Sequence, residues 1–284
     1  MDAIETSPDG PGPGTHWQVA DIDFTAVDRD AIAGDALAFR IVFLASLVET
    51  GSDLYAGNLV ACFGGDDEVA RWLVESWQVE EMRHGHALRS YVEHVWPEID
   101  WQRSYDAFFA EYSRTCTVDQ LAPERALELA ARCMVETGTA TLYGALHRYA
   151  REPVLKDLAA RIYADEVRHY KMFSRHFGRY QRREGRSRLR VGRTLLNRLL
   201  ATRSEDGRCA YRHVWDFAPN PAGEPLKASY AAFVRDLTAV LRRHAPAEML
   251  TRMILKPLAL PSPVVDAATR LSGPLYGLWL SAAR

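Results

Sequence analysis

The sequence predicts an all-α protein, in which four long helices form two antiparallel hairpins joined by one long crossover and followed by extra C-terminal helices. Three observations predict this fold class. Apolar residues recur at the three- to four-residue spacing of amphipathic helices along most of the chain. No segment shows the sustained alternation of apolar and polar residues that is typical of a strand. A pair of motifs also occurs twice, once in each half of the helical region.

Glycine and proline residues divide the helical region into its elements. Gly64 and Gly65 permit a left-handed turn after the first helix, and Pro97 ends the second. Pro123 and Pro153 stand where the third and fourth helices begin, because proline is tolerated in a first helical turn. The long helices are expected at residues 28–62, 68–95, 123–151 and 153–183, with one short helix, 101–113, inside the connection 96–122.

The two ends of the chain differ from this central region. Residues 1–27 are acidic and rich in proline and glycine, so we expect a flexible lead-in. Residues 28–184 are expected to form the bundle. Residues 185–284 hold three or four further helical pieces, and we expect them to pack against the bundle as a C-terminal extension.

Composition narrows the function classes. The 284 residues are 48% hydrophobic and 25% charged, with a formal net charge of −2, which is ordinary for a globular protein and excludes a strongly basic nucleic-acid binder. No apolar run reaches the length of a membrane span, and the N-terminus does not resemble a signal peptide. The four cysteines form no C-x-x-C pair, which argues against zinc ribbons, rubredoxin sites and thioredoxin motifs. We expect a cytoplasmic protein.

The internal repeat sets the order of the helices. VETGSDLYAG (48–57) resembles VETGTATLYG (135–144), and QVEEMRHGHA (78–87) matches ADEVRHYKMF (164–173) in its E-x-R-H core. The first two long helices therefore form one copy and the last two form the other. Two antiparallel hairpins joined by a long crossover are the connectivity of a ferritin-like bundle.

Each copy of the repeat supplies one lone glutamate and one E-x-x-H motif. Residues three apart on a helix share a face, so each Glu/His pair can bind one side of a site. The four glutamates also lie at similar distances from their hairpin turns, so the bundle brings them to one level. Chance predicts fewer than one E-x-x-H in a chain of this composition, and this chain has two. The candidate metal ligands are Glu49, Glu81, His84, Glu136, Glu166 and His169.

The surroundings of these residues favour metal ions. Glu49 follows the run IVFLASLV and Glu136 follows LAARCMV, so both carboxylates are expected in apolar surroundings, where an unpaired charge costs several kcal/mol. Buried salt bridges to Arg83 and Arg168 are the structural alternative, although two arginines hardly serve four carboxylates. Two divalent cations would balance four carboxylates. Carboxylate and imidazole donors without thiolate suit iron or manganese, so we expect two iron ions, with manganese or a mixed pair as the alternative.

These motifs resemble those of the diiron carboxylate proteins, and among them the soluble acyl-carrier-protein desaturases. The residues that carry the resemblance are EEMRHG (80–85), VETGT (135–139) and DEVRH (165–169), within a similarity that spans about residues 28–183. The resemblance implies that the six residues named above are the ligands of a dinuclear site. The chain is short for a desaturase, and its tail after Gly185 has no counterpart there.

The resemblance also implies roles for residues beside the ligands. Asp165, and Glu80 as its counterpart in the repeat, would hydrogen-bond the histidine ligands, with Arg83 and Arg168 next to them. Thr139 occupies the place of a hydroxyl on the O2 side of the site. The alternative for Thr139 is a hydroxyl bonded back to its own helix.

The leading functional hypothesis is an O2-dependent diiron oxidoreductase that acts on an organic substrate, such as an acyl chain on an acidic carrier protein. Desaturation, hydroxylation and N-oxygenation stay open, and electrons must come from a separate reductase or ferredoxin. A homodimer is expected. One alternative is a ferroxidase or a rubrerythrin-like peroxide scavenger, and another is an interaction protein whose cluster is only structural.

Three further features have competing interpretations. Ten arginines lie between Arg175 and Arg203 against one acid, Glu184. They form either a solvated surface or a docking site for an acidic partner. The candidate docking residues are Arg182, Arg183, Arg186 and Arg190. Trp77, one turn before Glu81, is either an electron relay or a core residue. Six histidines without a partner at ligand spacing are interpreted as surface or structural residues: His86, His94, His147, His176, His213 and His244.

Overall fold

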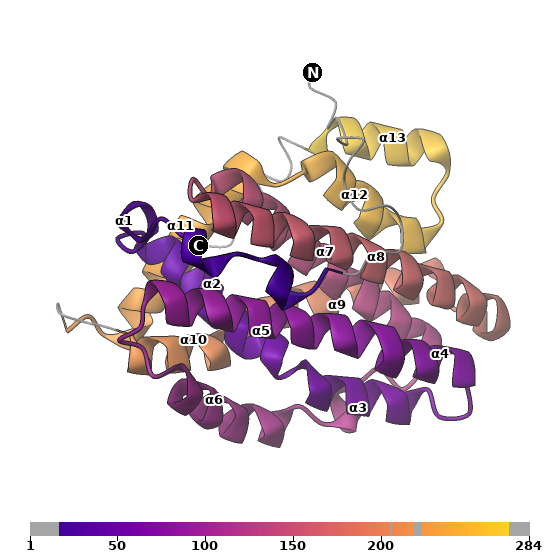
Figure 1. Ribbon diagram of the computed structural model, residues 1–284. Coiled ribbons are helices and arrows are strands. Elements are labelled where there is room, and N and C mark those ends of the chain that lie inside the picture. Colours follow the sequence, from indigo (N-terminus) through magenta and orange to yellow (C-terminus); the bar gives the residue numbers. More distant parts are fainter. Residues whose placement is uncertain (1–16, 205, 219–222, 273–284) are drawn as a thin grey trace.

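The computed structural model describes residues 17–204, 206–218 and 223–272, and this part of the chain is helical and contains no strand. The first hairpin pairs α2 (Ala36–Thr50) with α5 (Gln78–Val95), and the second pairs α7 (Arg125–Tyr149) with α8 (Pro153–Glu184). Figure 1 shows α5, α7 and α8 running side by side along the bundle. The crossover between the hairpins holds α6 (Trp101–Thr115). The all-α bundle of two hairpins with one crossover is thus the observed fold.

The ends of α8 show how the sequence fixes a helix in place. Pro153 occupies the first turn, and the buried carboxylate of Glu152 accepts the backbone N–H groups of Val154 and Leu155. Tyr91 of α5 donates a hydrogen bond to the same carboxylate at 2.9 Å, which ties the two hairpins together. Gly185 ends the helix in the left-handed conformation, with φ of 61°, which a glycine adopts without strain.

The first long helix is not continuous as expected. The structure divides residues 28–62 into α1 (Arg29–Ile32), α2 and α3 (Ser52–Cys62), with Gly51 between the last two. Tyr105 of the crossover helix donates a hydrogen bond to the carbonyl of Thr50, just before the break. This contact joins residues 55 positions apart, so helical periodicity alone does not reveal it.

The second long helix also contains an irregular segment. Its first part is α4 (Asp67–Trp72), and the turn Leu73–Trp77 then widens to a π-helix before α5 begins. π turns inside α-helices are frequent at functional sites. Both irregularities lie close to candidate ligands, because the break at Gly51 follows Glu49 directly and the π turn ends one turn before Glu81.

Residues 17–27 correct the expectation of a flexible lead-in. They form two 3-10 turns, Val19–Asp21 and Phe24–Ala26, and this segment lies against α5 (Figure 1). Trp17 is 7% exposed and its indole N–H donates to Asp165 on α8. The rest of the expected lead-in, residues 1–16, lies outside the described residues.

The described C-terminal region contains five helices, where three or four were expected, and four of them contact the bundle or its crossover helix. α9, α11 and α12 contact α7, while α10 contacts α6 and α2, and α13 contacts α12. Their bounds are α9 Arg188–Ser204, α10 Asp206–Phe217, α11 Leu226–His244, α12 Ala247–Leu255 and α13 Ser262–Arg270. Residue 205, between α9 and α10, is outside the described part of the chain.

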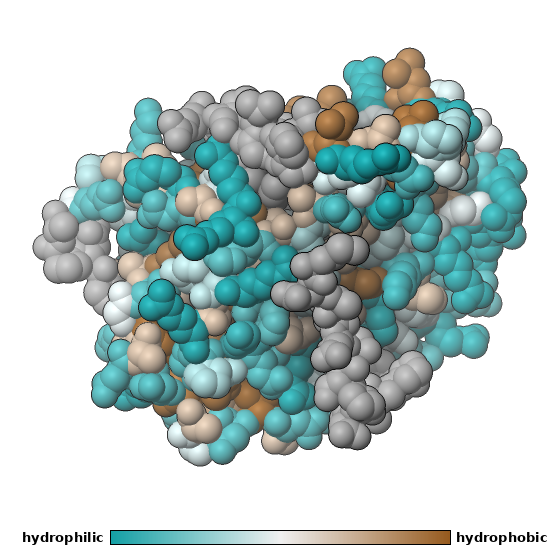
Figure 2. Space-filling model, turned by 90° about the horizontal axis from the view of Figure 1, so that it is seen from above, coloured by the Kyte–Doolittle hydropathy of each residue, from teal (hydrophilic) through white to brown (hydrophobic). Residues whose placement is uncertain are grey.

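The surface is mainly hydrophilic on the face shown in Figure 2, with apolar side chains in scattered places. Among the described residues, no helix combines the length and the apolarity that a membrane crossing needs. The four cysteines form no disulfide; Cys133 is buried and Cys62 is half-buried.

Gly85 allows α2 and α5 to approach closely beside the candidate site. A Cβ atom at this position would lie 2.5 Å from Oγ1 and 2.6 Å from the backbone N of Thr50. The backbone cannot rotate away, so the two helices would have to separate. We expect Gly85→Ala to lower the free energy of unfolding by about 1–3 kcal/mol in a denaturant titration. The control is Gly57→Ala in α3, where a Cβ meets nothing within 4 Å; equal losses in both variants would contradict the prediction.

Candidate metal centre

The structure brings the six candidate ligands together in the interior of the bundle. Glu49 comes from α2, Glu81 and His84 from α5, Glu136 from α7, and the remaining pair from α8. None of the six is more than 6% exposed. The expected convergence of side chains from four helices is therefore observed, and its cause is the common level of the glutamates along the hairpins.

The six residues form two sets that share two glutamates. Within each set, one donor atom per residue lies within 4.8 Å of every other. Glu81 and Glu166 belong to both sets, which is the position of ligands that bridge two ions. The first set is Glu49, Glu81, His84 and Glu166, and the second is Glu81, Glu136, Glu166 and His169.

Both imidazoles direct Nδ1 into the cluster. Nδ1 of His84 lies 3.4 Å from Oε1 of Glu166, and the two histidine rings lie 5.9 Å apart between centroids. Nδ1 of His169 lies 3.1 Å from Oε1 of Glu81 and 3.6 Å from a carboxylate oxygen of Glu136. Neither Nδ1 has a hydrogen-bond partner among the described residues.

The opposite nitrogen of each ring lies against one of the two acids, Asp165 and Glu80, that precede candidate ligand glutamates. Nε2 of His84 lies 3.0 Å from Asp165, and Nε2 of His169 lies 2.7 Å from Glu80. In the neutral ring, a carboxylate at this distance keeps the proton on Nε2, so the lone pair of Nδ1 would face the cluster. The acid before each ligand glutamate thus orients the histidine of the other hairpin.

The two arginines of the motifs bind these acids rather than the candidate ligands. Arg168 donates to Asp165 at 2.5 Å and to Glu80 at 2.9 Å, which links the two halves of the repeat. Arg83 donates to Asp165 at 2.9 Å. The salt-bridge alternative therefore fails for these two arginines, because they pair with Asp165 and Glu80 and with none of the four candidate ligand carboxylates.

Three residues of the site escaped sequence analysis. Trp17 donates to Asp165 at 2.9 Å and stacks on His84, with the ring centroids 6.0 Å apart. Tyr143 donates to Glu49 at 2.5 Å, and buried Arg132 lies 3.3 Å from Glu136. The spacing of Arg132, one turn before Glu136, was a usable signal, and Tyr143 lies within the repeated motif.

Thr139 contacts a candidate ligand. Its hydroxyl lies 2.6 Å from Oε2 of Glu166 and also 3.2 Å from the backbone carbonyl of Glu136. Both interpretations from the sequence thus have a geometric basis, and the contact to Glu166 is the shorter one. Trp77 is 3% exposed, with its ring edge toward His169 at 6.4 Å between centroids, as a core residue beside the site.

The pKa values of the clustered residues are shifted because buried charges lie close together. Burial, together with the charges of Glu81 and Glu166, raises the pKa of Glu49 well above its ordinary value. Burial likewise raises the pKa of Glu136 to about 7. Burial alone would lower the pKa of His84, but the hydrogen bond to Asp165 and the nearby negative charge of Glu166 raise it to about 9. Without metal, these side chains thus tend to bind protons, which reduces the negative charge of the cluster. Divalent cations would neutralise the same charge.

These observations fit a pair of metal ions. Three buried atoms that could bind metal have no hydrogen-bond partner among the described residues: Nδ1 of His84, Nδ1 of His169 and Oε1 of Glu166. All three point to the same cluster, and buried polar atoms are rarely left unsatisfied. Oxygen and imidazole donors without thiolate are the set that iron and manganese prefer.

The expected arginine dock is partly committed to contacts within the protein. Arg186 pairs with Glu184 and Glu124, and Arg190 pairs with Glu124. Arg183 lies over the ring of Tyr180. A docking role for Arg182 and its neighbours stays a prediction.

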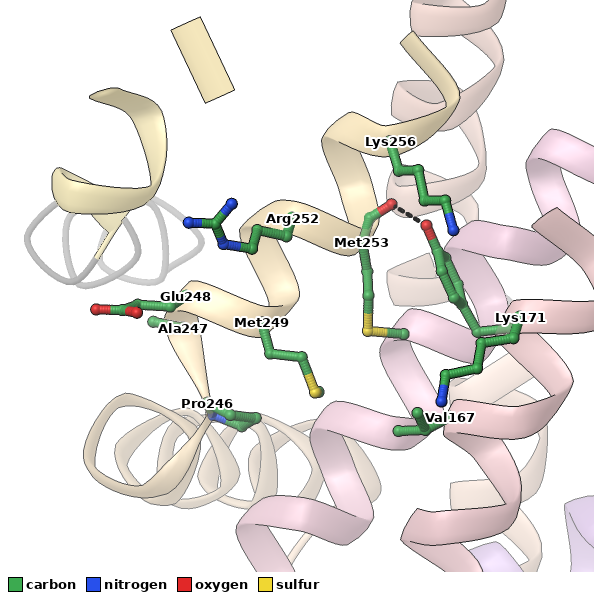
Figure 3. Close-up of a pocket in the computed structure, with 10 residues that line it drawn as sticks. Val167, Lys171, Pro246, Ala247, Glu248, Met249, Arg252, Met253 and Lys256 are labelled. Atoms are coloured by element: carbon green, nitrogen blue, oxygen red, sulfur yellow. Dashed lines mark hydrogen bonds between the residues drawn. The ribbon is translucent and has the colours of Figure 1, made fainter. Parts of the chain in front are cut away.

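A groove lies on the outer side of α8, between this helix and α12 (Figure 3). It has a volume of about 620 Å³, and its lining combines Val167, Met249 and Met253 with cationic side chains at Lys171 and Lys256. Tyr170, the neighbour of His169, donates a hydrogen bond to the carbonyl of Met253 across the groove. The outer face of α8 thus borders this groove while its inner face carries the candidate ligands.

Asp165 has hydrogen-bond contacts with four side chains around the site, so its replacement should have a large effect. Asp165→Asn keeps the shape but loses the charge that fixes Nε2–H of His84, so we expect metal affinity to fall roughly 10- to 100-fold. Equilibrium dialysis against Fe(II) under anaerobic conditions measures this change. The control is Asp157→Asn on the same helix, which breaks only a surface pair with Arg161. Unchanged affinity for Asp165→Asn would contradict the assigned role.

Comparison with known proteins identifies the fold. No protein-family model matches the chain, and no curated protein matches its sequence. Among solved structures, a mutant R2-like ligand-binding oxidase with a Mn/Fe cofactor aligns over 92% of this chain and 91% of its own, at 15% identity and a TM-score of 0.50. Another mutant with an Fe/Fe cofactor aligns at 16% identity over 92% and 87% of the two chains, with a TM-score of 0.49. The expected ferritin-like bundle is confirmed, and the resemblance to desaturases stays a prediction.

Proposed function

We propose that this protein is an O2-dependent oxidase that binds two metal ions, both iron or one manganese and one iron, and oxidises an organic substrate. The observation that carries the proposal is the pair of donor sets that share Glu81 and Glu166. Two ions bound there would lie side by side, and four carboxylates would balance their charge. Mixed oxygen and imidazole donors support iron or manganese, and the R2-like oxidases of similar fold contain Mn/Fe or Fe/Fe cofactors.

Three of the candidate ligands, His84, His169 and Glu49, have a hydrogen-bonding neighbour that sets their orientation. Asp165 and Glu80 hold the Nε2–H groups, so that Nδ1 of each histidine faces an ion. Tyr143 donates to the oxygen of Glu49 that faces away from His84, which leaves the other oxygen for a metal. Bound metal of this kind supplies the electrons that reduce O2. The protein groups supply position and charge.

Thr139 is the residue that we assign to the O2 side of the proposed site. Its hydroxyl bonds Glu166, one of the two shared ligands, and it is only half-buried. A hydroxyl here can hold a proton beside the reacting oxygen while it keeps the carboxylate in place. Desaturation, hydroxylation and N-oxygenation all fit this arrangement, with electrons from a separate reductase or ferredoxin.

Fe(II) titration tests this function. Protein without metal is loaded with Fe(II) under anaerobic conditions, the bound iron is counted, and the sample is mixed with O2 in a stopped-flow spectrophotometer. We expect two Fe(II) per chain and oxidation much faster than that of free Fe(II). His169→Ala should lose both properties. Wild-type protein that binds fewer than two ions, or that binds two and leaves them reduced in air, would refute the proposal.

Product analysis distinguishes the oxidase from iron storage. Fatty acyl chains, free and on a carrier protein, are supplied with O2 and a chemical reductant, and products are identified by mass spectrometry. Turnover of an organic compound supports the oxidase. A large cage-shaped oligomer that accumulates ferric iron beyond two ions per chain would instead favour a ferritin.

A further inference from the structure

A second group of metal-binding side chains lies far from the dinuclear centre along the chain. Glu111 of α6, with Cys209 and His213 of α10, places one donor atom each within 4.8 Å of the others. Nε2 of His213 lies 2.9 Å from Oε2 of Glu111. Cys209 and His213 are four residues apart on one helix, so both project from the same face toward α6. The sequence interpretation of His213 as a residue without a partner at ligand spacing was therefore wrong.

The surroundings of His213 indicate a ligand rather than a satisfied core histidine. The residue is 7% exposed and its ring packs edge-on against Phe108 of α6. Nε2 faces the carboxylate of Glu111, whereas Nδ1 is buried and has no hydrogen-bond partner among the described residues. A histidine kept only for structure normally satisfies both nitrogens when it is buried. Nδ1 of His213 is therefore left without a hydrogen bond in this cluster.

The donor set selects a metal different from that of the dinuclear centre. A thiolate, an imidazole and a carboxylate are together typical ligands of Zn²⁺, which binds sulfur and nitrogen in tetrahedral sites. The Cys209 thiolate and the Glu111 carboxylate would offer negative charge to a divalent ion, and Arg212 already pairs with the carboxylate. Arg212 donates to both carboxylate oxygens of Glu111, at 3.1 Å to Oε1 and 3.3 Å to Oε2, so it orients this side chain beside His213.

We propose that Cys209, His213 and Glu111 bind one Zn²⁺ ion that links α10 of the C-terminal region to the crossover helix α6. Three protein ligands leave the fourth tetrahedral position to water. Formation of the site releases the thiol proton of Cys209 and any proton shared between His213 and Glu111, and no oxidation or reduction takes place. The ion would fasten to the bundle a helix that already contacts it through side-chain packing, through the hydrogen bond from Ser104 to the backbone of His213, and through Arg212 and His213 at Glu111.

Cobalt titration tests the site in the intact chain. Co²⁺ bound to a thiolate gives a sulfur-to-metal charge-transfer band in the near ultraviolet, and none of the candidate ligands of the dinuclear centre is a cysteine. We expect this band in the wild-type protein, and its loss when one equivalent of Zn²⁺ is added. Cys209→Ser should abolish the band and remove one bound Zn²⁺ per chain, and His213→Gln should weaken both. Cys62→Ser, at another half-buried thiol, should leave both unchanged.

Two further variants keep the outcome clear. Glu111→Gln lies outside α10 and removes only a charge, so it should reduce Zn²⁺ binding even if a change in α10 impairs folding. Glu166→Ala should retain the band, because the proposed zinc site is independent of the dinuclear centre and of its function. Absence of the band in the wild-type protein, or its persistence in Cys209→Ser, would overturn the proposal.

Discussion

Glu166→Ala should eliminate tight binding of both metal ions, whereas Glu49→Ala should eliminate only one. Glu166 contributes a donor to both sets of ligands, and Glu49 contributes to the first set alone. The loss of affinity should exceed the roughly 10- to 100-fold that removal of a hydrogen-bonding neighbour costs. Metal analysis after anaerobic Fe(II) loading and gel filtration should therefore give two ions per chain in the wild type, one in Glu49→Ala and none in Glu166→Ala.

Glu128→Ala is the matched control for this series. Glu128 is also buried, lies on α7 two turns before Glu136, and belongs to neither donor set. It instead accepts hydrogen bonds from Tyr55 and from the backbone of Ala122. This variant should lose stability and keep two ions. Equal metal loss in Glu128→Ala and Glu166→Ala would mean that removal of any buried acid disrupts the bundle, and that the two donor sets are not a metal centre.

The bundle was predictable because its signals are local or repeated. Pro153 and Gly185 mark the ends of α8, and the two E-x-x-H motifs fix which faces of α5 and α8 meet. The break at Gly51 was not predictable from periodicity. It coincides with a hydrogen bond from Tyr105 and with the close approach of Gly85 to Thr50, and both contacts form only after the helices pack.

The candidate site also combines residues that the sequence predicts with residues that it does not. The six candidate ligands could be named from spacing, because a helix places residues three apart on one face. Trp17 could not, because it lies in a segment rich in proline and glycine, and its hydrogen bond to Asp165 spans 148 residues. Cys209 and His213 carried a visible four-residue spacing, but their third partner, Glu111, comes from a separate helix. Candidate ligands that lie in a repeated motif are therefore visible in the sequence. Residues that reach a site through one contact between distant segments are not.

Metal binding should raise the melting temperature of the protein markedly. The native cluster confines four carboxylates and two imidazoles away from water, and burial raises the pKa of Glu49 and Glu136 because their charges are poorly compensated. An ion that binds only the folded state stabilises it by about 4 kcal/mol when its free concentration is about 1,000 times the dissociation constant. For a domain of this size each kcal/mol corresponds to roughly 2–4 °C, so we expect an increase of about 8–16 °C.

Differential scanning calorimetry with and without Fe(II) or Mn(II), under anaerobic conditions, measures this shift. Glu166→Ala protein should show almost none of it, because both donor sets lose a member. Mg²⁺ should also have little effect, because it seldom accepts imidazole ligands and keeps its water. If the wild-type protein melted at one temperature in all of these conditions, the cluster would be stable through its own hydrogen bonds, and Arg132, Tyr143 and the histidines would be its compensating partners.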